Sequence, residues 1–310
     1  MWLGSRRGYL TDWATQLWVK ATGRVTDLQS SPWLDGPTAK VAGVGHRFFE
    51  DFASENGLVV RPGSGLIEDF SALRGPAFRP GDVAPQVRDF YQQTADFELD
   101  AWSEWCGFFK PFGQLLAILF SHRLQQLNVP LSSLDTSRGI TSRVLDLVEP
   151  ATGKRRYTAW VRQLLGSSNV LYAGNYSTCT VPDYPGICVK VVFPLPHGNA
   201  VVIMYPESAA DGSFSLTSSG REYGSPGFYF TVREGERLWA RYVRAMRETI
   251  RVYAASEGQV RADHVLRFCG KTFLRLHYRL RPTSARTPAA GQASSLSSGE
   301  AFQPPAPAKP

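Results

Sequence analysis

The chain has 310 residues, of which 43% are hydrophobic and 20% are charged, a composition typical of a folded globular protein. Its formal net charge of +7 is spread along the sequence without a basic run, so we expect no nucleic-acid partner. The sequence has no apolar run of the roughly 18 residues that a membrane helix needs. Asp12 and Gln16 interrupt the region where a signal peptide would be apolar, and we therefore expect a cytoplasmic protein.

The first 140 residues predict a helical layer. Apolar residues at helical spacing indicate helices that begin near Asp12, near residue 38, at Pro85 and at Pro111. None is long enough to be stable alone, so we expect 1–140 to pack on the rest of the chain. A separate domain with a boundary near 128–139 is the alternative.

Residues 141–280 predict consecutive antiparallel strands. Val, Tyr, Phe, Trp and Thr alternate with polar residues, and turn sequences such as Asp211-Gly212 separate the runs. About ten strands are expected. Their ranges are 141–149, 154–164, 169–180, 186–193, 200–206, 213–219, 227–232, 248–255, 259–269 and 272–280.

A meander of this length either exposes two long edges or curls until they meet. We therefore predict an α+β fold in which 141–280 closes into a β-barrel or deep, lipocalin-like cup. One inserted helix at 235–247 carries an arginine stripe of Arg237, Arg241 and Arg244. The Pro- and Ser-rich tail 281–310 is expected to be disordered.

The last hairpin contains two histidines. A turn at Gly270-Lys271 places His264 opposite His277 and next to Arg275, with Leu276 and Tyr278 on the other face. If the Leu and Tyr face lies in the core, the His and Arg face is solvated. If the His and Arg face lines the cup, the buried Arg275 requires an internal carboxylate or an anionic ligand.

The first hairpin gives a related pattern. A turn at Thr152-Gly153 places Arg143 opposite Arg162 and Leu145 opposite Trp160. Two facing arginines repel unless they are exposed or an anion lies between them. The residues expected to bind a ligand are Arg162, Arg275, Trp160, Tyr157, Tyr172 and Tyr176.

Catalytic motifs are absent from the sequence. His197, in a Pro-rich rim loop, joins His264 and His277 as a candidate acid or base, although a loop histidine is more often plain surface. Cys179 and Cys188 flank one turn and form either a disulfide or two thiols, the thiols being favoured in a cytosol. We expect no cofactor and no metal.

Two segments resemble a known family. Phe193-Pro-Leu-Pro-His-Gly-Asn199 and the hairpin from Arg261 to Leu280 are similar to the C-terminal soluble part of YndJ-like bacterial proteins. The resemblance extends over roughly 85–280 and implies no activity, because that family is itself uncharacterised. The membrane segments of longer members are not recognisable in this chain.

Three functions remain open. The first is binding of a small, largely apolar, possibly anionic molecule inside the cup. The second is a cofactor-independent acid/base enzyme, an isomerase, cyclase or hydrolase, that uses cup histidines. The third, less favoured, is docking to a membrane surface or protein partner through the arginine stripe.

Overall fold

The computed structural model describes residues 10–39, 47–107, 140–164 and 170–283. Three α-helices are present in these ranges: α1 (Leu10–Thr22), α2 (Phe48–Glu55) and α3 (Pro85–Gln92). The strands are β1 (Arg24–Thr26), β2 (Val59–Pro62), β3 (Phe97–Trp105), β4 (Ile140–Val148), β5 (Arg155–Leu164), β6 (Val170–Val181), β7 (Tyr184–Leu195), β8 (Gly198–Ser208), β9 (Phe214–Ser218), β10 (Gly227–Glu234), β11 (Arg237–Tyr242), β12 (Met246–Ala254), β13 (Val260–Phe268) and β14 (Lys271–Pro282).

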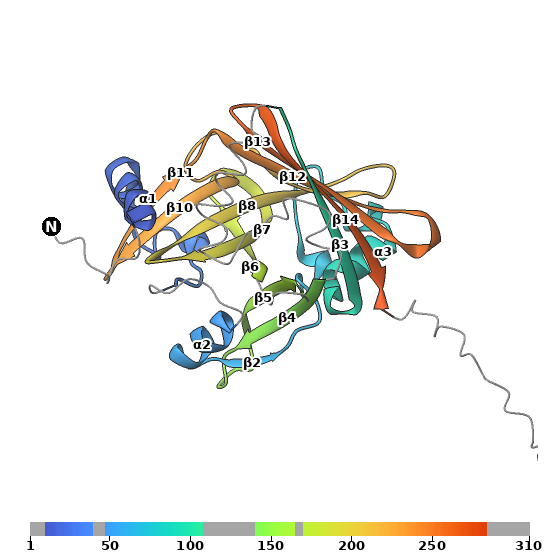
Figure 1. Cartoon of the computed structure of the whole chain (residues 1–310), viewed down its shortest axis with the longest axis horizontal. Helices are drawn as coiled ribbons and strands as arrows, with labels where there is room; N and C mark the ends of the chain where they lie inside the picture. Colours follow the sequence, from blue (N-terminus) through green and yellow to red (C-terminus); the bar gives the residue numbers. More distant parts are fainter. Residues whose placement is uncertain (1–9, 40–46, 108–139, 165–169, 284–310) are drawn as a thin grey trace, which may run out of the picture.

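One large antiparallel sheet contains all these strands, and its main path runs β2-β4-β5-β6-β7-β8-β9-β12-β13-β14-β3. The sheet forks at β8. Gly198 to Ile203 pair with β10, whereas Tyr205 to Ser208 pair with β9. Strands β10, β11 and β1 therefore form a side branch, while β9 and β12–β14 turn away to build a second wall, as Figure 1 shows.

The sheet is open, which corrects the prediction of a closed barrel. Its described path ends at β2 on one side and at β3 on the other. Strand β2 pairs only with the last residues of β4, from Leu145 to Val148. Gly63, the residue after β2, still donates its N–H to the Val144 carbonyl, but no other described strand pairs with the outer edge of β2.

The predicted helix at 235–247 is wrong, because this segment forms the β10–β11 turn, β11, the next turn and the first two residues of β12. Gly235 adopts a φ of 58° and closes the hairpin that pairs Glu234 with Arg237. Along β11 the burial alternates, with Leu238 and Ala240 buried and Arg241 exposed. A period of two fits this strand better than the helical spacing that we inferred. The arginine stripe therefore has no helix to carry it.

The N-terminal region supplies strands as well as helices. Helices α1 and α3 confirm the predicted starts near Asp12 and at Pro85. Of the helix predicted at 38–55, only α2 is helical among the described residues. The helix predicted at Pro111 and the tail from residue 284 lie outside the described residues, whereas Arg281 and Pro282 belong to β14.

Apolar residues form three clusters on the two faces of the sheet. The largest lies between the two walls and includes α3 residues Val87, Phe90 and Tyr91. The second lies beneath α2, and the third is covered by Trp33, Leu34 and β11. Strands β7 and β8 are buried along most of their length because they contact clusters on both faces.

Candidate ligand-binding site

A cavity of about 250 Å³ lies between the two walls of the sheet. One wall is formed by β5–β8 and the other by β12–β14, while α3 and the loop before it contribute Phe90, Tyr91 and Leu66. Most of the lining is apolar. The polar side chains in the lining are Tyr91, Arg162, Tyr172, Tyr176, Glu248, His264 and Tyr278.

The register of the last hairpin determines which histidine reaches the cavity. The turn is formed by Cys269 and Gly270, both with positive φ (48° and 79°), and a register shift follows between Leu266 and Arg267. His264 therefore pairs with Leu276, and the predicted opposition of His264 to His277 is wrong by one residue. Paired residues point to the same face of a sheet, and Leu276 lines the cavity. His264 therefore points inward with it.

The register of the first hairpin also differs from the predicted one, and it places Arg162 in the cavity. The loop closes at Glu149 and Lys154, and a register shift lies between Leu147 and Val148. Ser142 pairs with Arg162 and Val144 with Trp160, so the predicted pairings of Arg143 with Arg162 and of Leu145 with Trp160 are wrong. Arg143 instead points outward to Glu50, at 2.8 Å.

The Arg162 side chain lies among aromatic rings. Its guanidinium carbon is 4.2 Å from the centre of the Trp160 ring, 4.3 Å from Tyr172 and 5.6 Å from Tyr278. The residue is only 8% exposed, and its Nε has no hydrogen-bond partner among the residues that the structure describes. Within the described part of the chain, no carboxylate forms an ion pair with this guanidinium.

Three tyrosine hydroxyls surround the same region. The hydroxyl oxygens of Tyr172 and Tyr176 are 2.7 Å apart and share a hydrogen bond. Burial raises the pKa of Tyr176 to about 12 and also raises the pKa values of Tyr172 and Tyr278. All three hydroxyls therefore remain protonated at neutral pH. One proton of Tyr172 and Tyr176 lies in their mutual hydrogen bond, so Tyr278 and one hydroxyl of that pair can donate to a further acceptor.

The opposite wall carries one acid and one imidazole. Glu248 Oε2 and His264 Nε2 are 3.1 Å apart, and these side chains are only 10% and 14% exposed. Glu248 also influences the titration of Tyr176 and Tyr278 electrostatically, although less than burial does. The Glu248–His264 pair and Arg162 therefore belong to one polar region inside an apolar cavity.

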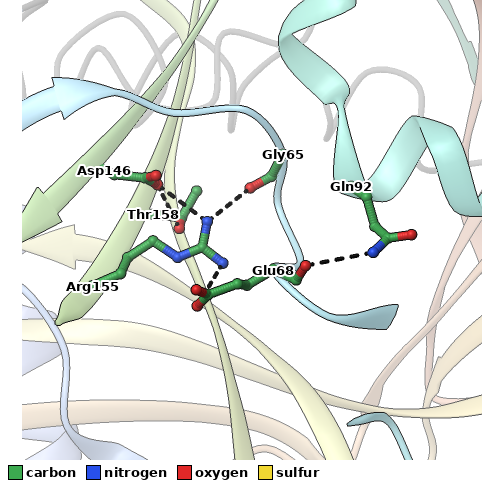
Figure 2. A network of polar contacts seen from close by, with 6 residues as sticks. All are labelled: Gly65, Glu68, Gln92, Asp146, Arg155 and Thr158. Atoms are coloured by element: carbon green, nitrogen blue, oxygen red, sulfur yellow. Dashed lines mark hydrogen bonds and ion pairs between the residues drawn. The ribbon is translucent and has the colours of Figure 1, made fainter. Parts of the chain in front are cut away.

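A polar network holds the loop and helix that contribute Leu66, Phe90 and Tyr91 to the lining (Figure 2). Arg155 on β5 reaches Glu68 at 3.2 Å and Asp146 at 3.4 Å. Burial raises the pKa of Asp146, and Thr158 donates a hydrogen bond to the same carboxylate at 3.1 Å. The network also includes the Gly65 carbonyl and Gln92 of α3, and so it connects the segment around Leu66 to the sheet.

Four of the six residues predicted to bind a ligand line this cavity: Arg162, Trp160, Tyr172 and Tyr176. Tyr157 lies on the other face of β5, in the cluster beneath α2, and its hydroxyl donates to Asp35. Arg275 is exposed on the outer face of β14 and forms an ion pair with Glu104 at 3.3 Å.

The two remaining histidine candidates do not line the cavity. His277 is on the outer face of β14, bonded to Asp263 at 2.7 Å and stacked on Trp102. His197 lies in the β7–β8 turn with a φ of 60°, where its N–H donates to the Ala39 carbonyl. The first of the two alternatives therefore holds for Arg275 and His277, which lie on the outer face, but not for His264, which lines the cavity.

Glu248 was absent from the predicted site, although the sequence carries a signal for it. Met246, Glu248, Ile250 and Val252 occur at a spacing of two, so a single carboxylate lies in an apolar row. The incorrectly predicted helix at 235–247 concealed the start of that row.

Cys179 and Cys188 lie opposite each other across the β6–β7 hairpin, where both are free thiols.

The chain is similar to the uncharacterized membrane protein YndJ of Bacillus subtilis strain 168. The two are 26% identical over 242 residues, which confirms the resemblance expected from the two segments. The match covers 76% of this chain and 41% of YndJ, so the chain spans less than half the length of that relative. No protein-family model and no solved structure matches the chain significantly. Among the described residues, no helix is long and apolar enough to cross a membrane.

Proposed function

We propose that the chain binds a small, largely apolar molecule in this cavity and that Arg162 contacts its polar end. The observation that supports the proposal is a buried guanidinium facing an apolar cavity without a carboxylate partner among the described residues. The lining resembles that of small-molecule sites, which combine apolar walls with a few convergent polar groups.

The energetic cost of burying Arg162 supports a ligand as its partner. Burying an unpaired charge costs several kcal/mol, whereas stacking on aromatic rings recovers roughly 0.5–2 kcal/mol. The Nε atom also lacks an acceptor. A ligand with an oxygen acceptor would satisfy this atom and offset the remaining cost. The cavity of about 250 Å³ is larger than the roughly 150 Å³ cavity known to hold benzene, so it has room for such a molecule.

The test is recovery of a bound molecule. Chain purified from its own host under non-denaturing conditions is analysed by native mass spectrometry, and the released ligand is identified after solvent extraction. We expect a discrete adduct of one apolar molecule per chain. The Arg162→Met variant should lose most of the adduct, while Arg275→Met, which removes an exposed arginine, should retain it.

A protein that carries no adduct, and that binds no member of an apolar compound library after solvent stripping, would contradict the proposal. Equal loss of the adduct from Arg162→Met and Arg275→Met would contradict the role of Arg162. Circular dichroism of each variant establishes that the fold is retained.

A second function, acid/base catalysis, is favoured by the Glu248–His264 pair. An imidazole held by a carboxylate at 3.1 Å within a cavity has the arrangement of a general base. An enzyme of this kind should convert the extracted ligand or a relative of it into an isomer, cyclic product or hydrolysis product. Recovery of every candidate compound unchanged after prolonged incubation, equally with wild type and His264→Asn, would leave binding as the function.

A further inference from the structure

We infer that the ligand is a monocarboxylate of medium size, with its carboxylate at Arg162 and its apolar part beside the buried Leu280. This inference rests on the proposed binding function and specifies the chemical class and orientation of the ligand. It depends on the charges that line the cavity, the geometry of Arg162 and the distribution of apolar residues along the strands.

The charges favour a ligand with a single negative charge. Arg162 is the only Lys or Arg among the described residues that line the cavity, and Glu248 is the only carboxylate. A monoanion at Arg162 pairs with one positive charge. Arg162 and Glu248 together give the lining a formal charge of zero, so a dianion, such as a phosphate monoester, would leave two uncompensated negative charges where a monoanion leaves one. The lining therefore discriminates against dianions.

The donors around Arg162 match a carboxylate. The planar guanidinium presents a fork of N–H groups that fits two carboxylate oxygens, and its Nε is without an acceptor. The rings of Tyr172 and Tyr278 lie beside the guanidinium, and the neutral Tyr278 hydroxyl can donate to the same headgroup. A headgroup with two oxygen acceptors satisfies these donors better than an alcohol does.

The ladder pairings give the orientation. Leu280 pairs with Val260 and Leu99, and all three are at most 6% exposed. Glu248 lies nearer the opposite end, where it pairs with the partly exposed Leu266, while His264 and the partly exposed Leu276 lie near the middle of their strands. The row at Leu280 is thus buried and apolar, and a hydrocarbon group gains most from burial there.

The volume limits the size of the apolar part. Benzene, with six carbon atoms, occupies a cavity of about 150 Å³, or roughly 25 Å³ per atom, so a cavity of 250 Å³ holds on the order of ten such atoms. A medium-chain fatty acid or an aromatic carboxylic acid has this size. The chemical class is therefore a compact amphiphilic acid.

Isothermal titration calorimetry of the solvent-stripped chain at pH 8 tests the headgroup, with decanoate, decyl phosphate, decanol and decyltrimethylammonium used below their micelle concentrations. We expect decanoate to bind about tenfold or more tightly than decanol, because a charge-assisted hydrogen bond replaces a neutral one. Arg162→Met should abolish this preference, and Arg275→Met should preserve it. Glu248→Gln should strengthen binding of decyl phosphate relative to decanoate.

The outcomes separate this inference from the proposed function. Equal binding of decanol and decanoate overturns the carboxylate assignment but leaves an apolar binding protein. Tightest binding of decyl phosphate overturns the preference for a single charge, and tightest binding of decyltrimethylammonium assigns the headgroup to Glu248 instead. If none of the four compounds binds, the carboxylate assignment and the proposed binding function fail together.

The orientation is tested by narrowing the cavity at the Leu280 row. Leu99→Phe should weaken decanoate more than hexanoate, because only the longer chain reaches that row. Leu276→Phe, a matched substitution at a partly exposed position, should leave the preference for the longer chain intact. Equal effects of Leu99→Phe on both acids would overturn the orientation, provided that the thermal midpoint shows a folded variant.

Discussion

Glu248 and His264 meet diagonally across the β12–β13 ladder, with 3.1 Å between Oε2 and Nε2. Glu248 pairs with Leu266 and Ile250 with His264, so the contact joins residues one step apart in the ladder. Neither side chain makes another side-chain hydrogen bond within the described part of the molecule. The hydrogen bond between them is therefore the main interaction that offsets the cost of burying each side chain.

The Glu248–His264 pair should show strong coupling in a double-mutant cycle. His264→Leu leaves a mostly buried carboxylate without its partner, and we expect the free energy of unfolding to fall by roughly 3 kcal/mol. Glu248→Leu/His264→Leu should fall by about 1–3 kcal/mol less than the sum of the single variants. Urea unfolding of the four proteins measures the cycle. Strict additivity would show that the contact contributes nothing.

The Arg162 side chain should contribute nothing to the free energy of unfolding of the ligand-free protein. We expect Arg162→Met to keep the free energy of unfolding within about 1 kcal/mol of wild type, or to raise it, because the variant removes a buried charge that lacks an ion-pair partner. The same urea titration without ligand measures this effect. A loss of several kcal/mol would assign Arg162 to the folded core instead of to a ligand.

The turn at Cys269-Gly270 should control the register that brings His264 inward. Both residues have positive φ, which matches the type I′ turn for which Asn-Gly is favoured. We expect Cys269→Asn to raise the free energy of unfolding by up to about 1 kcal/mol and Gly270→Ala to lower it by about 1–2 kcal/mol. Lys271→Ala, in the adjacent strand position, is the control. A Cys269→Asn variant less stable than wild type would refute this account of the turn.

Alkaline pH should destabilise the protein partly through Tyr176. Burial raises its pKa from 10.0 to about 12, so between these values the unfolded chain loses a proton that the folded chain retains. The contribution of Tyr176 is therefore complete below pH 10, and stability falls by up to about 1.4 kcal/mol per pH unit above it.

Tyr176→Phe should make the fall of stability between pH 10 and 12 shallower, as measured by urea unfolding at a series of pH values. Phe90→Leu, in the same apolar cluster, removes no ionisable group and should lower the whole curve without changing its slope. A slope that is unchanged in Tyr176→Phe would mean that this hydroxyl is not shielded from water.

The strands between residues 141 and 280 could be predicted because their alternating pattern is local. The structure places a strand at every predicted position from β4 to β10 and from β12 to β14. Strand β3 has the same period of two in Phe97, Leu99 and Ala101, but its partner β14 lies far along the chain. No local turn sequence indicates such a pairing, and the strand was missed.

The faces of the strands were harder to predict, because one residue of register reverses them. A turn predicted at Gly270-Lys271 instead of Cys269-Gly270, together with the register shift near Leu266, was enough to group His264 with His277 and Arg275 on one face. The alternation of Ala262, His264 and Leu266 with Arg261 and Asp263 indicates the correct face. Alternation within one strand is thus a better guide to the inner face than the assumed geometry of its turn.

The fork in β8 places the residues that set the width of the cavity on a different strand from those that set its charge. Ala200, Val202 and Met204 face the cavity from the strand at which the sheet divides, whereas the charged groups lie on β5, β12 and β13. Side-chain size on β8 can therefore change the room for a hydrocarbon chain without altering the arginine. Evolution could adjust ligand length and ligand charge independently in such a protein.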